Sequence, residues 1–275
     1  MAVFTVRIIY QHERKNKMGK LDGKVVVITG AGSGLGKQFA IRMAREGAKL
    51  AIVTKNAERL AATKQLCEEA GAEVLAYACD VAEYDELVKF VDQTIARFGT
   101  VDVLVNNVHH VVLAPFIDLK IEDFMYDLKV DFCSTWHLMQ LLFPYMKDKP
   151  GAGASIINFG SRWGQESPPM SGEYSPLKEA VRALSRTVAR EWGQYNIRCN
   201  IVCPGGFTDN AKNDLHKQLP EMQKYAMASF QDNAFHRLGD PYDDVAPVVV
   251  FLASDESKWL TGQTINTDGG GWMAD

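Results

Sequence analysis

The stretch KVVVITGAGSGLG, residues 24–36, decides the fold of this chain. It begins with β-branched and apolar residues typical of a buried strand and runs through Gly30, Gly34 and Gly36 into a segment with helical periodicity. Glycines at such a turn let the backbone approach a pyrophosphate at the N-terminus of the helix, where the helix dipole favours negative charge. The stretch therefore predicts an α/β fold with a dinucleotide at this turn.

The alternation of short apolar runs and helical-period segments continues along the chain, as in βαβ units around a parallel sheet. Strands are expected at Lys24–Thr29, Lys49–Thr54, Glu73–Ala78, Val101–Asn106, Ser155–Phe159, Asn196–Val202 and Gln263–Asn266. Helices are expected at about Gly34–Glu46, Ala57–Ala70, Glu83–Phe98, Ile121–Met146, Tyr174–Tyr195 and Tyr242–Ala253. We predict a single-domain, doubly wound (Rossmann) α/β fold over residues 21–275, with a seven-stranded parallel sheet and helices on both faces. An N-terminal extension (1–20) and a lid-like insertion (about 205–240) complete it.

Composition restricts the class of protein and of partner. Hydrophobic residues make up 47% of the 275 residues and charged residues 23%, as in globular proteins. The net charge of −4 and the lack of a basic tract argue against nucleic acid and membrane partners and favour a small molecule. The five cysteines form no C-x-x-C pair, so we expect reduced thiols and no metal site. The sequence shows neither a signal peptide nor a membrane-length apolar run, so a cytoplasmic location is expected.

Candidate acid/base residues lie at the start of the helix expected from Tyr174. Tyr174 and Lys178 are four residues apart and share one helix face, where the ammonium favours the ionised form of the phenol. Ser161 follows the strand Ser155–Phe159, at the carboxyl end of the sheet where α/β folds bind ligands. These three side chains predict general acid/base catalysis.

Taken together, these motifs resemble the short-chain dehydrogenase/reductase family. The resemblance covers Leu21 to Gly270 and includes the glycine pattern Thr-Gly-x-x-x-Gly-x-Gly, the Ser/Tyr/Lys set and the segment Asn200–Gly205. It implies hydride transfer between a nicotinamide and a carbonyl or secondary alcohol. It also implies that Ser161 binds the substrate oxygen, that Tyr174 exchanges the proton and that Lys178 holds the nicotinamide ribose.

The resemblance also implies a set of cofactor-binding residues: Gly30, Ser33, Gly34, Leu35, Gly36, Thr54, Lys55, Asp80, Val81, Asn107, Tyr174, Lys178, Pro204, Gly205 and Phe207. Lys55 follows the second strand, where an acidic residue would bind the ribose hydroxyl of NAD and a basic residue suits the 2′-phosphate of NADP. We therefore favour NADP, with NAD as the alternative if Lys55 is only a surface lysine. Asp80 either contacts the adenine or caps the next helix.

Three positions depart from the family pattern. The fourth strand is followed by Val108-His109-His110 where the family has Ala-Gly. His109 or His110 therefore either shapes the substrate or cofactor pocket, or modulates the pH response, or faces solvent. Asp131 occupies the place of an Asn that is linked to the active-site lysine through water, and is included among the catalytic residues. A carboxylate there either preserves this link or raises the pKa of Lys178. Thr208 falls one residue earlier than the usual threonine.

A bulky hydrophobic alcohol or ketone is the expected substrate, with His109, Trp163 and Phe207 as substrate residues. Further apolar side chains expected around the cleft are Pro168, Pro169, Met170, Met222, Tyr225, Met227 and Phe230. Three segments, Ile156–Gly164, Lys178–Arg182 and Arg237–Pro241, are similar to bacterial hydroxysteroid dehydrogenases, which favours a steroid or bile acid. The alternatives are a 3-oxoacyl-thioester reductase and a catalytically weak nucleotide-sensing protein. The resemblance also implies a homotetramer.

Overall fold

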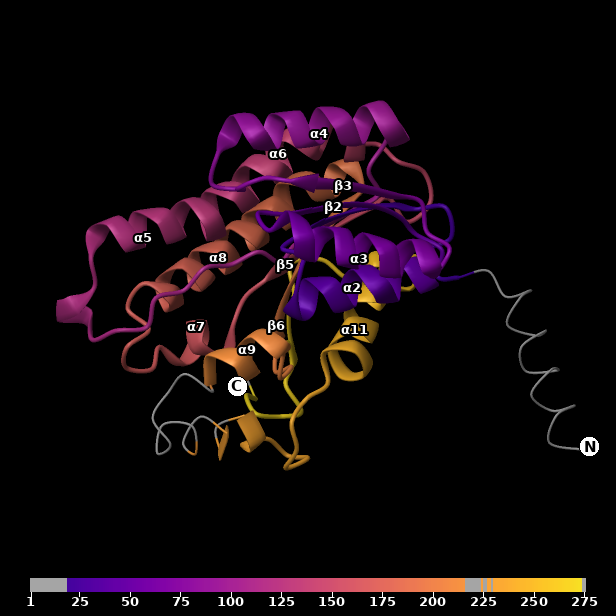
Figure 1. Ribbon diagram of the computed structural model, residues 1–275. Coiled ribbons are helices and arrows are strands. Elements are labelled where there is room, and N and C mark those ends of the chain that lie inside the picture. Colours follow the sequence, from indigo (N-terminus) through magenta and orange to yellow (C-terminus); the bar gives the residue numbers. More distant parts are fainter. Residues whose placement is uncertain (1–18, 216–223, 225–226, 229, 274–275) are drawn as a thin grey trace, which may run out of the picture.

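The computed structural model describes residues 19–215, 224, 227–228 and 230–273. The described chain contains a seven-stranded sheet in the order β3-β2-β1-β4-β5-β6-β7, with every neighbouring pair parallel (Figure 1). The strands are β1 Val25–Thr29, β2 Lys49–Thr54, β3 Val74–Ala78, β4 Val103–Asn106, β5 Ala154–Phe159, β6 Ile197–Pro204 and β7 Thr264–Thr267. This confirms the predicted doubly wound fold.

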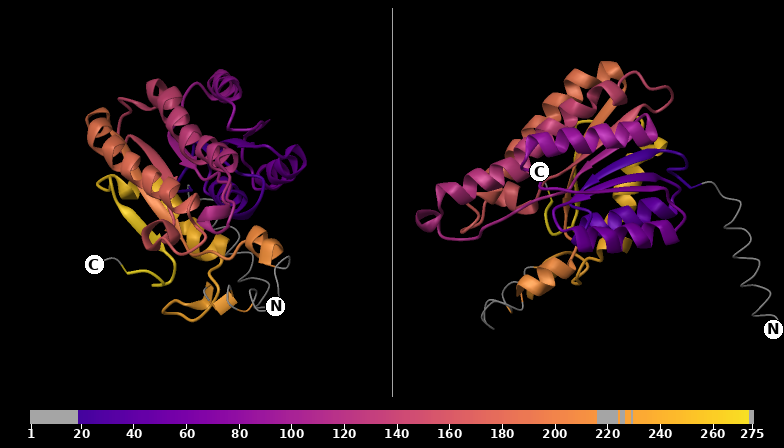
Figure 2. Two further views of the ribbon diagram at one scale, coloured as in Figure 1. Left: turned by 90° about the vertical axis from the view of Figure 1, so that its left-hand side faces the viewer. Right: turned by 45° about the horizontal axis from the view of Figure 1, so that its top comes forward.

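Helices cover both faces of the sheet, which explains the unbroken apolar runs of the central strands (Figure 2). Helices α2, α3 and α11 pack on one face, where Phe39 and Met43 are fully buried, and α4, α6 and α8 pack on the other over Phe90 and Leu138. The helix bounds are α2 Gly34–Arg45, α3 Ala57–Glu69, α4 Tyr84–Phe98, α5 Ile121–Asp127, α6 Ser134–Met146, α7 Arg162–Glu166, α8 Tyr174–Trp192, α9 Asp209–Leu215 and α11 Ala246–Ala253.

The helix expected over Ile121–Met146 is present but changes its winding in the middle. A π-helical segment, η2 (Leu128–Cys133), joins α5 to α6. A second π-helical segment, η4 (Pro241–Val245), precedes α11, and short 3₁₀ turns are found at η1 (Phe116–Asp118), η3 (Gly193–Tyr195) and η5 (Asp255–Ser257). Because π-helical turns inside helices often occur at functional sites, η2 directs attention to its buried Asp131.

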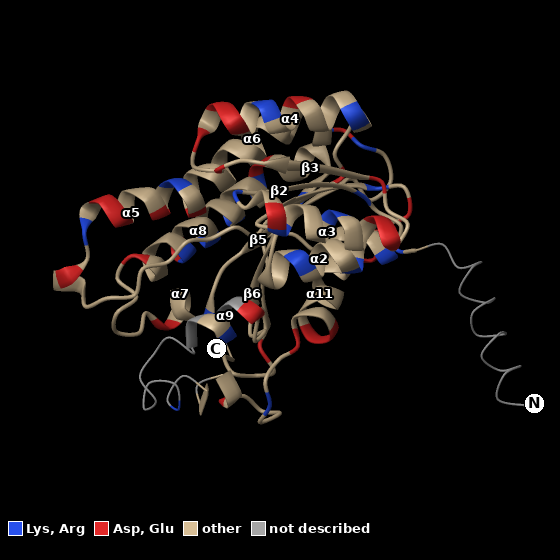
Figure 3. Ribbon diagram, in the orientation of Figure 1, with Lys and Arg blue, Asp and Glu red and all other residues tan. Residues whose placement is uncertain are grey.

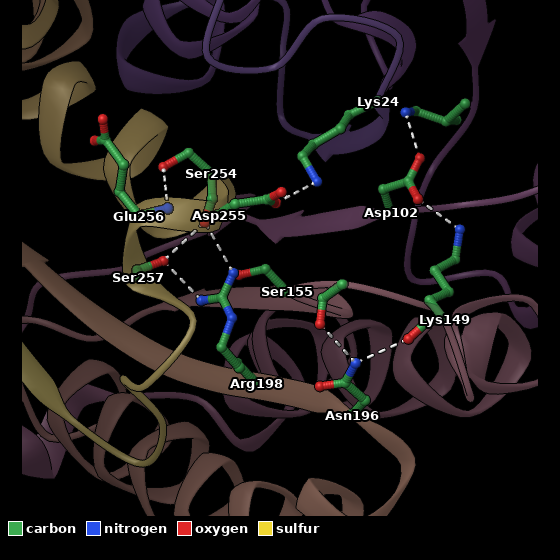
Figure 4. A network of polar contacts seen from close by, with 12 residues as sticks. Lys24, Asp102, Lys149, Ser155, Asn196, Arg198, Ser254, Asp255, Glu256 and Ser257 are labelled. Atoms are coloured by element: carbon green, nitrogen blue, oxygen red, sulfur yellow. Dashed lines mark hydrogen bonds and ion pairs between the residues drawn. The ribbon is translucent and has the colours of Figure 1, made fainter.

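Arg198 of β6 holds the C-terminal end of α11 (Figure 4). Its Nη1 donates to the carbonyl of Leu252 at 3.0 Å and to Ser257 Oγ at 2.8 Å, and its Nη2 donates to the carbonyl of Ser254 at 3.2 Å. Ser155 of β5 also donates to the Leu252 carbonyl. Since the last carbonyls of a helix have no partner within it, these bonds fix α11 against the sheet.

The strand order reverses between β1 and β4, and ligands of such folds bind at the carboxyl ends of the strands at this point. The glycine turn follows β1 there, and Asn107 follows β4. No helix in the described part of the chain is long and apolar enough to cross a membrane. The expected pocket residues Met222 and Tyr225, and most of the extension 1–20, lie outside the described residues.

Candidate active site

The glycine turn after β1 is shaped so that larger residues cannot occupy it. Gly30 has φ of +67°, and a Cβ at Gly36 would lie 2.4 Å from the Gly30 carbonyl oxygen. The first turn of α2 begins at Gly34, after Ser33 in extended conformation, and carries Leu35. A bare backbone at a helix N-terminus fits a pyrophosphate, so this cradle is compatible with a bound dinucleotide.

Asn107 braces this turn from the neighbouring strand. Its Nδ2 donates to the Thr29 carbonyl at 3.0 Å, and Thr29 Oγ1 accepts the backbone N–H groups of Asn107 and Val108. A Cβ at Gly30 would lie 2.9 Å from the same Nδ2. Asn107 therefore fixes the turn through protein contacts.

Lys55 and Asp80 were expected to bind separate parts of the cofactor, but the structure pairs them. Lys55 Nζ lies 2.7 Å from Asp80 Oδ2, and the Tyr126 hydroxyl donates to the same oxygen at 3.0 Å. Burial raises the pKa of Asp80, but hydrogen bonds from Lys55, from the Ala82 N–H and from Tyr126 outweigh this and lower it. Asp80 Oδ1 accepts the Ala82 N–H, so the side chain also caps the turn that carries buried Val81.

Arg59 is a cation near the glycine turn that the sequence analysis missed. A Cβ on Gly32 would lie 3.2 Å from Arg59 Cβ and 2.8 Å from Thr54 Cγ2, which places the first turn of α3 against the glycine turn. Asn56 caps α3 by accepting the Arg59 N–H at 2.9 Å. The exposed Arg59 guanidinium forms no ion pair within the described part of the chain. The cap signal at Asn56, followed by a basic residue in the first turn, could have indicated it.

Tyr174 and Lys178 lie in the first turns of α8, as predicted. Lys178 Nζ is 5.4 Å from the centre of the Tyr174 ring and donates to Asp131 Oδ1 at 2.9 Å. The Lys178 and Asp131 side chains are 5% and 1% exposed, so this ion pair is sealed from solvent. Burial lowers the pKa of Lys178, but Asp131 and Tyr174 more than offset it, so the pKa is raised. The direct contact answers one question left by the sequence: Asp131 raises the pKa of the lysine.

Ser161 is the N-cap of α7. Its Oγ accepts the Trp163 N–H at 3.1 Å, which leaves the hydroxyl proton available to donate. The Trp163 ring meets the Tyr174 ring edge-on, with centroids 6.5 Å apart. The cap thus connects the serine to the tyrosine through Trp163.

The two histidines after β4 both turn toward the helices of the site. The ring of His109 lies edge-on to Tyr174, with centroids 6.3 Å apart, although the residue is exposed. Crowding by protein atoms and the charge of Lys178 lower the pKa of His109. His109 thus lies beside Tyr174 and is also exposed to solvent. His110 Nδ1 contacts Asp127 Oδ1, a pairing that the sequence did not indicate.

The segment Pro204–Thr208 begins at the end of β6 and lies beside the glycine turn. A Cβ on Gly206 would lie 3.3 Å from Leu35 Cδ2, so this segment passes close to the glycine turn. The Phe207 N–H donates to the Gly239 carbonyl at 2.8 Å, so of its backbone polar groups only the carbonyl is left for the expected contact with a carboxamide. The Phe207 ring packs against Phe230 at 4.9 Å between centroids. Thr208 caps α9 through the Ala211 N–H.

Comparisons with known proteins agree with this arrangement. Residues 30–271 match a family model described as enoyl-(acyl carrier protein) reductase. The chain is 34% identical to a 12alpha-hydroxysteroid dehydrogenase of Clostridium sp., over 92% of this chain and 98% of the relative. It is also 34% identical to a 3-oxoacyl-[acyl-carrier-protein] reductase of Thermotoga maritima, over 91% and 98%. A solved 7 alpha-hydroxysteroid dehydrogenase complexed with NADH and 7-oxo glycochenodeoxycholic acid has a TM-score of 0.83 at 34% identity, over 92% and 96% of the two chains. This chain therefore belongs to the short-chain dehydrogenase/reductase family of oxidoreductases, which act on alcohol and ketone groups.

Proposed function

We propose that this enzyme transfers a hydride between NADP(H) and a bulky hydrophobic secondary alcohol or ketone, such as a steroid or bile acid. The observation that carries the proposal is the sealed Lys178–Asp131 pair beside Tyr174, with the Trp163 and His109 rings against the phenol. A tyrosine held between two rings and a buried ammonium is positioned for acid/base work on a bound oxygen.

In this proposal each residue acts on the substrate oxygen or holds a neighbour in place. In the reducing direction, the Ser161 hydroxyl donates a hydrogen bond to the carbonyl oxygen, and Tyr174 gives its proton to the same oxygen as negative charge develops. The Lys178 ammonium stabilises the phenolate left behind. The nicotinamide, when bound, supplies the hydride.

The substrate preference rests on apolar side chains around Tyr174. Trp163 of α7 and Met170, a few residues after that helix, are exposed, and Phe207 packs against Phe230. Phe116, which the sequence analysis did not single out, is 80% exposed and lies close to Gly172, just before α8. An open apolar surface of this kind suits a rigid hydrophobic ligand. The similar proteins named for 12alpha- and 7 alpha-hydroxysteroids support the same class.

The test follows absorbance at 340 nm with NADP or NAD and a panel of steroid, bile acid and simple secondary alcohols. We expect turnover with NADP on a steroid or bile acid, and a fall in kcat of about 10²–10⁴-fold in Tyr174→Phe, because proton transfer is removed. Quenching of protein fluorescence by NADPH should persist in the variant, which keeps the ring and loses only the hydroxyl of Tyr174. Cofactor binding without turnover on any panel member would contradict the proposal.

The preference for NADP rests on two cations, Lys55 directly after β2 and Arg59 in the first turn of α3. Residues 52–56, at the end of β2, include no carboxylate for a ribose hydroxyl. Lys55 is already paired with Asp80, so Arg59 is the cation we assign to the 2′-phosphate. Losing a charge-assisted hydrogen bond costs about 1.5–3 kcal/mol, or about ten- to a hundredfold in affinity. We expect Arg59→Ala to raise KM for NADP by this factor and leave KM for NAD unchanged. Lys64→Ala, farther along α3, is the control, and an equal change with both cofactors would remove Arg59 from this role.

A 3-oxoacyl-thioester reductase is the second candidate, because the Thermotoga maritima relative is as similar as the steroid enzyme. A carrier protein requires a cationic landing surface. Around the described ends of the lid, Lys212 and Lys224 occur with Asp209 and Asp232, and Figure 3 shows both signs of charge interspersed over the helices in view. Turnover of an acetoacetyl thioester above that of every steroid in the panel would favour this candidate. For the assembly, we propose a homotetramer.

A further inference from the structure

We propose that His110 and Asp127 form a proton relay that connects the buried Lys178–Asp131 pair with solvent. The inference rests on the proposed function, because the proton concerned is the one that Tyr174 takes from an alcohol during oxidation. The two residues act through Asp131 and Lys178 and do not touch the reacting atoms. His110 belongs to the Val108-His109-His110 segment that departs from the family pattern.

The relay begins at a site that has little access to water. Lys178 and Asp131 are almost completely buried, and Lys178 donates to only one of the two Asp131 oxygens. The other oxygen, Oδ2, is also buried and has no hydrogen-bond partner among the described residues. A buried carboxylate oxygen without a donor is costly, and accepting a proton relieves that cost. Oδ2 of Asp131 is therefore the atom through which the proposed relay continues away from Lys178.

Asp127 provides the next step. It lies four residues before Asp131, at the junction of α5 and η2, and its side chain is 0% exposed. Like Asp131, it has one oxygen paired with a basic group and a buried Oδ2 without a partner in the described chain. Burial raises the pKa of Asp127 and the contact with His110 lowers it, but burial together with the charges of Asp131 and Asp123 outweighs His110, so the pKa is raised. A carboxyl group with a raised pKa holds a transferred proton at lower cost.

His110 is the exit. Its Nδ1 contacts Asp127, while 47% of its side chain is exposed. Tyr126 holds the imidazole edge-on, with ring centroids 5.2 Å apart. An imidazole can accept a proton at one nitrogen while releasing another from the second nitrogen, so the ring passes protons between Asp127 and water.

The proton count balances over the proposed relay. Lys178 takes the phenol proton as it passes one of its own to Asp131, Asp131 passes one to Asp127, and His110 releases one to solvent. Every member returns to its starting state, and no electrons move along the path. Other charged groups lie around the His110–Asp127 pair. They are Asp123 of α5, His109 of the loop that carries His110, and the Lys55–Asp80 pair, which hydrogen-bonds to Tyr126.

The test separates proton transfer from positioning through two variants at one residue. His110→Asn keeps an N–H that can donate to Asp127 but cannot pass a proton on, whereas His110→Ala removes the ring and leaves an exposed opening. We expect both to lower kcat for alcohol oxidation by about tenfold or more, with KM within about twofold and a larger solvent isotope effect. Added imidazole should restore kcat in His110→Ala only. His137→Ala, whose ring packs on Tyr84, is the matched control.

A second readout needs neither cofactor nor substrate. Proton NMR of the ligand-free protein should show a strongly downfield Nδ1–H signal that is lost in His110→Ala and in Asp127→Asn but kept in His137→Ala. Wild-type kcat in His110→Asn, or failure of imidazole to restore His110→Ala, would overturn the relay while hydride transfer stands. Absence of turnover in the wild type would instead overturn the proposed function. If His110→Ala does not fold, the NMR signal and the His110→Asn kcat decide.

Discussion

Asp131 is the residue where this chain differs most consequentially from its family pattern. A carboxylate in direct contact with Lys178 stabilises the buried ammonium that would otherwise have to lose its proton. The sequence indicated that Asp131 lies near Lys178 and either preserves the link to the lysine or raises its pKa. It did not indicate the direct contact between the two side chains. That contact depends on the winding of η2 and on the packing of η2 against α8, which no local pattern records.

The contribution of the Asp131–Lys178 ion pair can be measured from the pH dependence of the free energy of unfolding. A lysine with a raised pKa stabilises the folded state below its unfolded-state pKa of about 10.4, and this contribution disappears as pH rises through the raised value. In Asp131→Asn, burial acts on Lys178 without the opposing charge, so its pKa falls and the protonated form destabilises the fold at neutral pH. We expect the free energy of unfolding to drop by about 3 kcal/mol at pH 7, at the lower end for a broken buried pair because the amide oxygen still accepts a hydrogen bond.

Urea unfolding between pH 7 and pH 10 checks this expectation. The difference from wild type should shrink as pH rises, since Lys178 of the variant loses its proton first. Glu122→Gln, on the exposed side of α5, should stay within about 0.5 kcal/mol of wild type at every pH. A loss of unfolding free energy in Asp131→Asn that does not change with pH would mean that the two side chains stabilise the fold through packing and not through charge.

At the scale of elements, periodicity predicted the sheet and the long helices because burial dictates both patterns. The strands are sandwiched between helices, so their apolar runs are unbroken. The observed bounds of the strands differ from the expected ones by at most two residues. The five-residue helix α7 escaped prediction because its contacts are distant in sequence. Gln165 of α7 donates to Asn266, 101 residues away, and accepts from Trp272 Nε1, 107 residues away. Such long-range contacts leave no periodic signal.

In the site too, contacts within one helix were predicted, whereas contacts between residues distant in sequence were not. Tyr174 and Lys178 share one helix face, so spacing alone brought them together. The Lys55–Asp80 pair and the His110–Asp127 pair join different elements, and their partners follow only from the folded chain. These cross-element contacts are the basis for the proposed roles of Arg59 and of the His110–Asp127 pair.

At the scale of the whole molecule, the helices that carry the site also expose an apolar stripe. Ile121 and Met125 of α5 and Trp136 of α6 are 64%, 45% and 40% exposed, and Phe132 packs beside Trp136 with ring centroids 6.0 Å apart. They lie along one helical run, α5–η2–α6, on the face of the sheet opposite α3. Exposed apolar residues grouped around an aromatic side chain are typical of the centre of a protein–protein interface.

If this stripe is an interface of the proposed homotetramer, a single charge at its centre should dissociate the protein. Burying an unpaired lysine at an aromatic anchor costs about 2 kcal/mol or more per interface, or about thirtyfold or more in the dissociation constant. We expect Trp136→Lys to lower the mass found by light scattering from that of a tetramer to that of a dimer or monomer at micromolar concentration. Leu66→Lys, a comparably exposed apolar position on α3 of the other face, should leave the mass unchanged. A tetramer that survives Trp136→Lys would place the interface elsewhere, and a wild-type monomer would remove the assembly altogether.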